Sequence, residues 1–393
     1  MDAVSEFRKR RAERIAEKKY GADREAVEAY RKRRAARLDA KWEENEHPRD
    51  ENGKFTSGGF GASKRSRAYH HDPNEKGGGN TKSGSEFPKI KGVTHEKKEA
   101  GFVVPVFDEA TFTENFEEKK KIAREAAKRI VPEIRKTFST KVNDIKRPEV
   151  NDDTIAYLKK SLGNVTQEQI EKGLEEAGKI YSYWEKNEPV ITETVVGAVK
   201  GVGGTMFGLD NRIKFDKSLA KKAIADANNP LLGYDGNVER ASANIKDGIR
   251  YTAVFESDNF VEGYKKVKEA LEKMGIREYR CKNFFKQYRE QDGSDGKIGE
   301  QKSVQCVFET PDGKKFELQF HTPESMAAKE VNHPTYKQKK EPESEYVEFN
   351  QPRSLFMRDT SSVVPDPDGV FDIEEHKRGE TGYKQAPNKK ANP

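Results

Sequence analysis

Phe316-Glu317-Leu318-Gln319-Phe320-His321 is the most informative segment of the sequence. Apolar and polar residues alternate along it, which is the period of a β-strand with one face in a hydrophobic core. We therefore predict that Phe316, Leu318 and Phe320 face the core and that the three polar residues share the opposite face. A row of carboxylate, amide and imidazole groups on one face favours a functional site over a merely solvated surface.

The run that precedes this stretch has the same alternation. Residues 303–310 form two rows of side chains, and Pro311-Asp312-Gly313 between the runs is typical of a tight turn. The two runs predict a hairpin. Its core face would contain Val304, Cys306 and Phe308, and its opposite face would contain Ser303, Gln305 and Val307.

Helical and strand-like segments surround the hairpin and predict an α+β fold, with a mixed sheet and flanking helices. Further strands are predicted at 248–256 and 278–284, and a polar loop at 287–300. The predicted helices cover 117–136, 152–162, 166–186, 216–228, 260–274 and 323–333, with Asp216 as an N-cap and Thr166 and Gln169 as a capping box. Gly201-Val202-Gly203-Gly204 lacks the Gly-Lys-Ser/Thr ending of a phosphate loop, so we predict a turn there.

The composition limits the kind of protein. Only 33% of the 393 residues are hydrophobic and 36% are charged, against roughly 45–50% and about 25% in ordinary globular domains. Part of the chain therefore lies outside a buried core. No apolar run is long enough to span a membrane or to act as a signal region, which predicts a cytoplasmic protein. Cys281 and Cys306 are the two cysteines, and both lie inside predicted strands. They exclude a disulfide scaffold and a cysteine-based zinc site, and they fit a reducing cytosol.

The sequence divides into five regions by composition. Residues 1–46 form a charged helical docking segment, and a nine-residue stretch at 7–15 recurs 23 residues later. A salt-bridged helix pair and a docking element for a large partner or nucleic acid both fit this segment. The other regions are a flexible linker at 47–100, in which we expect His70-His71 to be solvated, a helical region at 101–200, a domain at 201–340 and a mobile tail at 341–393.

Two resemblances to known proteins add to these predictions. His47-Pro48-Arg49-Asp50-Glu51-Asn52-Gly53-Lys54-Phe55-Thr56 resembles a segment of tailed-phage structural and head-associated proteins. It implies a phage-encoded or particle-delivered chain whose residues 1–60 contact capsid components. Residues 205–337, about a third of the chain, resemble the synthetase domain of RelA/SpoT-type alarmone synthetases, which implies a nucleotidyltransferase-like fold.

Four stretches carry the second resemblance, in the family's order. They are Arg212-Ile213-Lys214-Phe215-Asp216-Lys217-Ser218, Asp247-Gly248-Ile249-Arg250, Lys302-Ser303-Val304-Gln305 and Glu317-Leu318-Gln319-Phe320-His321-Thr322. His333 follows at the position of a helix histidine in short family members.

The resemblance implies a role for each of these residues. Arg212, Lys214 and Ser218 would bind the donor ATP, with Lys302, Ser303 and His333 completing the nucleotide site. Asp247 and Glu317 would hold Mg²⁺ as hard oxygen ligands, and Glu317 would also accept a proton. Gln319 and His321 would orient the acceptor.

The departures from the family pattern concern mainly the acceptor side. Ile245 stands where the family has its aspartate, so Asp247 is a shifted substitute. Gln301, Gln305 and His321 replace the family's tyrosine, histidine and arginine. These differences indicate a divergent, toxin-like branch whose acceptor is a nucleotide, for example an adenosine nucleotide, or a tRNA 3′ end.

The predicted function is that of an ATP pyrophosphokinase. It would transfer the β,γ-pyrophosphate of ATP to a 3′-hydroxyl with Mg²⁺ as cofactor, in the manner of (p)ppGpp-like alarmone synthesis, and act as a phage or mobile-element toxin. The alternative is a non-enzymatic virion-associated protein, structural or binding nucleic acid through residues 1–46.

Overall fold

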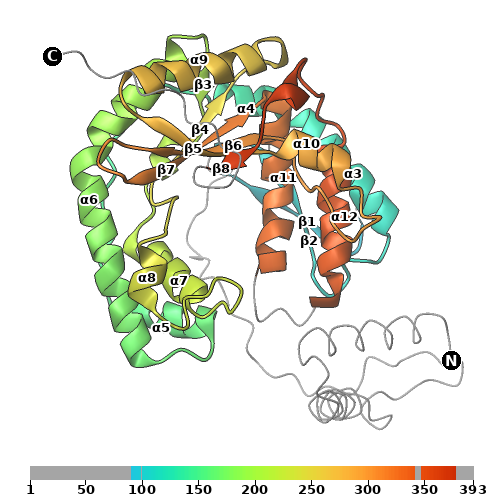
Figure 1. Cartoon of the computed structure of the whole chain (residues 1–393). Helices are drawn as coiled ribbons and strands as arrows, with labels where there is room; N and C mark the ends of the chain where they lie inside the picture. Colours follow the sequence, from blue (N-terminus) through green and yellow to red (C-terminus); the bar gives the residue numbers. More distant parts are fainter. Residues whose placement is uncertain (1–89, 99, 341–346, 378–393) are drawn as a thin grey trace, which may run out of the picture. The chain divides into compact units, whose positions relative to one another are not determined.

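The structure is a computed structural model that describes residues 90–98, 100–340 and 347–377 (Figure 1). All of them belong to one compact unit. Residues from Phe102 to Ile373 contribute to one hydrophobic cluster. The predicted helical region and the predicted domain at 201–340 therefore share a core. The predictions for residues 1–46, for the phage-like segment and for His70-His71 lie outside the described residues.

A mixed sheet forms the centre of this unit and confirms the predicted α+β class. Its six described strands have the order β3-β4-β7-β6-β5-β8 (Figure 1). Strands β4 and β7 are parallel, and the other described pairs in the sheet are antiparallel. The strands are β3 (Thr205–Met206), β4 (Arg250–Val254), β5 (Arg277–Asn283), β6 (Val304–Glu309), β7 (Lys315–His321) and β8 (His376–Lys377).

The β6–β7 hairpin has the predicted register. Cys306 lies opposite Leu318, and Gln305 lies opposite Gln319, so the two rows of side chains fall on the two faces as expected. Gly313 has a φ of 81°, a conformation that glycine adopts without steric cost. Phe316, Leu318 and Phe320 are fully buried.

Two helices cover the core face of the sheet, α6 (Gln167–Lys200) and α9 (Phe260–Lys273). The Tyr264 ring of α9 lies 5.2 Å from the Phe320 ring, centroid to centroid. A Cβ atom on Gly263 would approach the Phe255 ring to 2.4 Å, so glycine is required for α9 to pack this closely. On α6, the Thr192 hydroxyl is hydrogen-bonded to Tyr251 of β4 at 2.6 Å.

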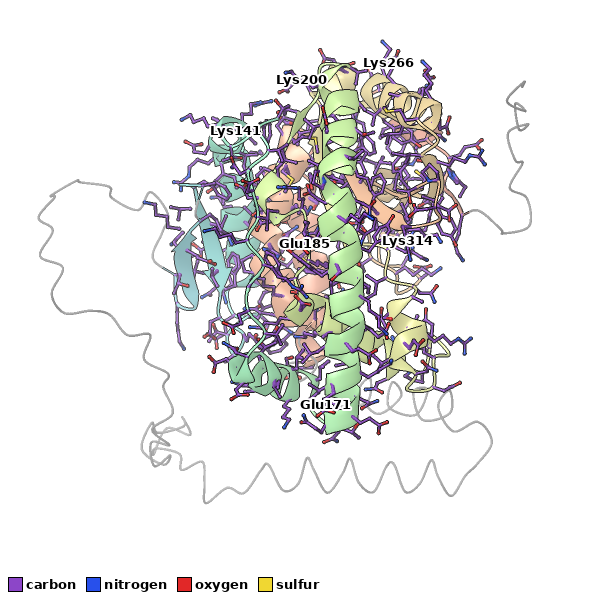
Figure 2. The ribbon with its side chains drawn as sticks, turned by 90° about the vertical axis from the view of Figure 1, so that its left-hand side faces the viewer. Lys141, Glu171, Glu185, Lys200, Lys266 and Lys314 are labelled. Atoms are coloured by element: carbon purple, nitrogen blue, oxygen red, sulfur yellow. The ribbon has the colours of Figure 1, made fainter. Side chains whose placement is uncertain are left out.

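Helix α6 is longer than the sequence predicted. It begins with the expected capping box of Thr166 and Gln169 but continues past residue 186 through Pro189 to Lys200 (Figure 2). Proline removes a helical hydrogen bond and usually ends a helix. Here burial of residues 191–199 against the sheet holds the helix together beyond the proline.

The remaining elements surround the sheet (Figure 1). Near the start of α6 lie α5 (Asp152–Leu162), α7 (Asp216–Ala227) and α8 (Val238–Ser242). A second group of elements packs together around α11 (Pro323–Lys340). It consists of a hairpin of β1 (Val93–Lys97) and β2 (Val103–Phe107) and of the helices α3 (Phe116–Arg129), α4 (Val131–Lys136) and α12 (Asn350–Ser361). Within the described part of the chain, 3₁₀ turns cover Leu209–Asn211, Ser257–Asn259, Val347–Phe349 and Val370–Asp372.

Several sequence predictions need correction. The loop expected at 287–300 begins as helix α10 (Phe284–Glu290), because Asn283 accepts a hydrogen bond from the Lys286 amide and caps it. Asp216 is the first helical residue rather than the N-cap, and its carboxylate binds Arg147 in a bidentate pair at 2.6 and 2.8 Å. Strand β1 falls within the predicted linker.

The prediction of a mobile tail over 341–393 is wrong for residues 347–377. Helix α12 packs against α11 and α3, and β8 pairs with β5. The buried Lys302 ammonium anchors this segment by donating to the Val364 carbonyl at 2.7 Å and pairing with Asp366 at 2.8 Å. Among the described residues, no helix is long and apolar enough to cross a membrane.

The two faces of β7 should respond differently to mutation. Phe320→Ala should lower the free energy of unfolding by about 3–5 kcal/mol, because it leaves a cavity between fully packed rings. Glu317→Gln, on the other face, should change it by less than about 1 kcal/mol. Chemical denaturation followed by circular dichroism measures both, and equal losses would show that the faces are assigned the wrong way round.

Candidate active site on the polar face of the sheet

The parallel pairing of β4 and β7 brings two predicted motifs together. Arg250 lies opposite Glu317 in the register, and Thr252 lies opposite Gln319. The Glu317 amide donates a hydrogen bond to the Ile249 carbonyl at 3.0 Å. Asp247 precedes Ile249 by two residues, so it stands at the start of β4 beside the strand that carries Glu317.

Asp247 is held by two lysines. Its carboxylate pairs with the Lys214 ammonium, and the Lys222 ammonium of α7 lies 3.5 Å from Oδ1. Burial alone would raise the pKa of the carboxyl, but Lys214, Lys222 and Arg250 outweigh that effect and lower it. Asp247 is therefore an anion at neutral pH, surrounded by three cations.

Glu317 is oriented by a short chain of hydrogen bonds. Lys329 of α11 donates to Gln319 Oε1 at 2.6 Å, and Gln319 Nε2 donates to Glu317 Oε1. An ammonium group can only donate, so Lys329 fixes which way the Gln319 amide faces. Gln319 is buried, and in this arrangement it positions the Glu317 carboxylate.

Positive charge accumulates around these groups. Burial lowers the pKa of Lys329 to about 8, and the nearby Arg250 guanidinium adds to the shift. Partial desolvation lowers the pKa of His333 to about 4, with Lys337 and Lys98 contributing. Burial is the main cause of both shifts, and the neighbouring cations add to them. An anionic ligand would relieve the repulsion among these cations.

Three predicted donor residues occupy different surroundings. Lys214 lies in the cluster of charged side chains around Asp247 and Glu317, where burial lowers its pKa. Ser218 is exposed on α7, one turn before Lys222 and on the same side of the helix. The Arg212 guanidinium is buried instead, where it pairs with Glu188 and donates to two backbone carbonyls. This arrangement directs Arg212 into the core rather than toward a triphosphate.

Three other predicted residues are buried outside the cluster. Lys302 holds the C-terminal segment through Asp366, and Ser303 is fully buried next to it. His321 is also fully buried, with Nδ1 hydrogen-bonded to Ser325 Oγ at 2.8 Å. Burial holds the pKa of His321 well below its usual range, so the ring is neutral. We therefore expect these three residues to support the fold of the site rather than to touch ligands.

The prediction from sequence missed three cations of the cluster. Lys222 lies four residues after Ser218, so its face of α7 could have been inferred. Arg250 belongs to a motif that the sequence singled out, but it was assigned no role. Nothing in the sequence indicates that Lys329 belongs to this cluster, because its position depends on how α11 packs across β7.

A concave region of about 390 Å³ adjoins the cluster. Lys315, two residues before Glu317 on the same face of β7, lies on its wall, as does Lys246 next to Asp247. Glu176 and Glu239 share this wall with basic and aromatic side chains. The basic and aromatic side chains include Lys179, Tyr183, Trp184, Tyr279 and Lys314, and Figure 2 shows Lys314 beside α6.

The acidic residues of the cluster suit a magnesium ion. Asp247 and Glu317 offer the hard oxygen atoms that Mg²⁺ prefers. Asp247 Oδ1 is buried and accepts no hydrogen bond from the described residues. An oxygen atom in this state can serve as a ligand to a cation.

Comparisons with known proteins assign no family. No protein-family model and no curated protein match the chain. A chain in the crystal structure of the complex between the type VI effector Tas1 and its immunity protein is similar, with 18% identity and a TM-score of 0.30. The match covers 48% of this chain and 96% of that chain. A likeness at this level does not assign an activity.

The displaced pKa of Lys329 predicts a pH-dependent stability. Between its folded pKa of about 8 and the ordinary value of about 10.4, the unfolded chain holds a proton that the folded chain has lost. This group therefore makes the fold more stable as pH rises through that window. Lys329→Met should melt higher than wild type at pH 7, and the difference should shrink by pH 9.5. Thermal melts at matched ionic strength test this, and an equal difference at both pH values would contradict it.

Proposed function

We propose that the chain is an ATP pyrophosphokinase that uses the polar face of β4 and β7 as its active site. The observation that carries the proposal is the placement of Glu317 beside Arg250, with Asp247 and its lysines at the start of the same strand pair. The sequence stretches that resemble alarmone synthetases converge there from three separate segments. The activity follows from that convergence together with the surplus of cations.

The donor would bind through its phosphates. Lys214, Lys222 and Arg250 can exchange their present partners for phosphate oxygens, since transfer of a phosphoryl group depends on positioning and charge neutralisation. Asp247 and Glu317 would hold Mg²⁺, which would neutralise charge on the triphosphate. The ion pairs of Asp247 with the two lysines would hold these side chains in place before ATP enters.

The transfer step uses Glu317 as the base. The acceptor hydroxyl oxygen would form a bond to the β-phosphorus of ATP, and the bond between that phosphorus and the bridging oxygen to the α-phosphate would break. AMP leaves with that oxygen, and Glu317 takes the hydroxyl proton. Gln319 and Lys329 keep the carboxylate facing the acceptor through their hydrogen bonds.

The concave region whose wall includes Lys315, two residues before Glu317 on β7, would hold the acceptor. Its lysines suit the phosphates of a nucleotide or of a tRNA 3′ end, and its tyrosine and tryptophan rings suit stacking on a base. The predicted setting as a phage or mobile-element effector remains part of this proposal. A non-enzymatic virion protein remains the alternative, and the assay below separates the two.

Glu317→Gln should abolish pyrophosphate transfer. The full chain is incubated with Mg²⁺, γ-labelled ATP and a panel of nucleotides and tRNA, and labelled acceptor and AMP are measured. Because the change removes both the base and a metal ligand, the rate should fall by more than roughly 10²–10⁴-fold. Excess chelator should stop the wild-type reaction.

Glu262→Gln, on α9 at the opposite face of the sheet, is the matched control and should keep full activity. Release of ADP in place of AMP would indicate transfer of a single phosphate and contradict the proposal. An active Glu317→Gln protein would also contradict it. If no acceptor is labelled and no AMP forms with any member of the panel, the non-enzymatic alternative is favoured.

A further inference from the structure

A second group of reactive side chains lies on the core face of the same sheet. Glu278 and Cys281 of β5 and Cys306 of β6 are buried, and each offers a ligand atom within 4.8 Å of the others. His376 of β8 joins them, with Nε2 3.2 Å from Glu278 Oε2. Two thiols, a carboxylate and an imidazole therefore meet across three neighbouring strands.

The strand register explains how they meet. Cys281 is the direct partner of Cys306 on one side and of His376 on the other. Glu278 and Cys281 are three residues apart, so in a regular strand their side chains would point to opposite faces. The register shifts between Glu278 and Arg280. This bulge turns Glu278 onto the face of the cysteines.

We propose that Glu278, Cys281, Cys306 and His376 form a Zn²⁺ site. The donor set is the main reason, because zinc in structural sites takes four tetrahedral ligands from cysteine, histidine and carboxylate side chains. The proposal is independent of the proposed transferase activity.

The charges around the cluster balance with and without the metal. The Lys268 ammonium lies 2.7 Å from Glu278 Oε2, so a neutral pair exists while both thiols are protonated. Zn²⁺ with two thiolates and one carboxylate carries a net charge of −1, which Lys268 then neutralises. Binding would release the two thiol protons.

Tyr264 adds an outer-shell contact of the kind that orients metal ligands. Its hydroxyl donates to Glu278 Oε1 at 3.0 Å, and such contacts fix a ligating carboxylate. Oε2 is then directed toward His376 and Lys268. Glu278 is 2% exposed and Cys306 is 0% exposed, so the site has no room for a substrate and the metal would be structural.

Metal binding would hold the C-terminal segment against the sheet. Strand β8 is two residues long and pairs with β5. His376 is the sole ligand on β8, so the metal would tie residues 350–377 to the sheet. From the sequence, a cysteine-based zinc site was excluded because the chain has only two cysteines, both in predicted strands. The sheet brings these two cysteines together with Glu278 and His376, and the proposed site reverses that prediction.

Cobalt(II) is the probe that tests this site. The full chain has only two cysteines, so a sulfur-to-cobalt charge-transfer band can arise only from Cys281 and Cys306. With the protein reduced by a phosphine, one equivalent of Co²⁺ should produce that near-ultraviolet band together with the visible bands of tetrahedral cobalt. Zn²⁺ should displace the cobalt and raise the melting temperature.

Three variants assign the ligands. Cys306→Ala should lose the band. His376→Gln, at the edge of the sheet, should weaken Co²⁺ binding by more than about tenfold, the loss that even outer-shell changes cause. His95→Gln on β1 is the control and should bind as wild type. Absence of the band from folded, reduced full-length protein would overturn the site, as would an unchanged affinity in a folded His376→Gln protein.

Discussion

The parallel pairing of β4 with β7 is the constraint on which the candidate site depends. Within the described sheet the other pairs are antiparallel. Because β4 runs beside β7 in the same direction, Arg250 and Glu317 fall opposite each other near the start of both strands. An antiparallel β4 would place the Asp247 loop at the far end of β7. The fold therefore places the start of β4, which follows Asp247, beside the start of β7, which carries Glu317, although 70 positions separate the two acidic residues in the sequence.

The cluster differs electrostatically from the rest of the interior. Elsewhere several buried charges have a partner of opposite sign, as in Arg212 with Glu188 and Lys302 with Asp366. On the polar face the cations outnumber the acids. They are Lys214, Lys222, Arg250 and Lys329 against Asp247, Glu317 and Glu330. Burying unmatched positive charge costs stability, and such an excess is retained where a polyanion is bound.

The sequence was sufficient for the strands and the register of the hairpin, because alternation in 303–322 is unambiguous and the Pro-Asp-Gly turn fixes the pairing. It was insufficient where tertiary packing overrides local rules. The predicted helix at 166–186 stopped short, yet α6 continues through Pro189 to Lys200 because one face of its last turns is buried. The charged composition after residue 340 indicated a tail, yet Lys302 and the β5 edge hold residues 347–377 in place.

The candidate site was predicted in part for the same reason. Asp247, Glu317, Gln319 and Lys214 could be found from motif order, because local spacing and strand faces are visible in a sequence. The motif pattern also suggested Arg212, Lys302 and Ser303, but motif order does not show which way a side chain turns. The contribution of Lys329 depends on the path of α11 over the sheet. Whether a side chain is buried, and which groups it contacts, depends on the whole fold.

Binding of an uncleavable ATP analogue is the most direct test of whether the polar face of β4 and β7 is an ATP site. Calorimetry with α,β-methylene-ATP and Mg²⁺ measures whether the polar face holds the triphosphate, without requiring the correct acceptor. We expect one binding site for the analogue on the full chain. Arg250→Met should lower its affinity more than about tenfold, because the change removes a charge-assisted contact. Arg277→Met, at the start of β5 on the same sheet, should bind as wild type. Equal binding by both variants, or no binding by the wild-type chain, would contradict the assignment of this face as the ATP site.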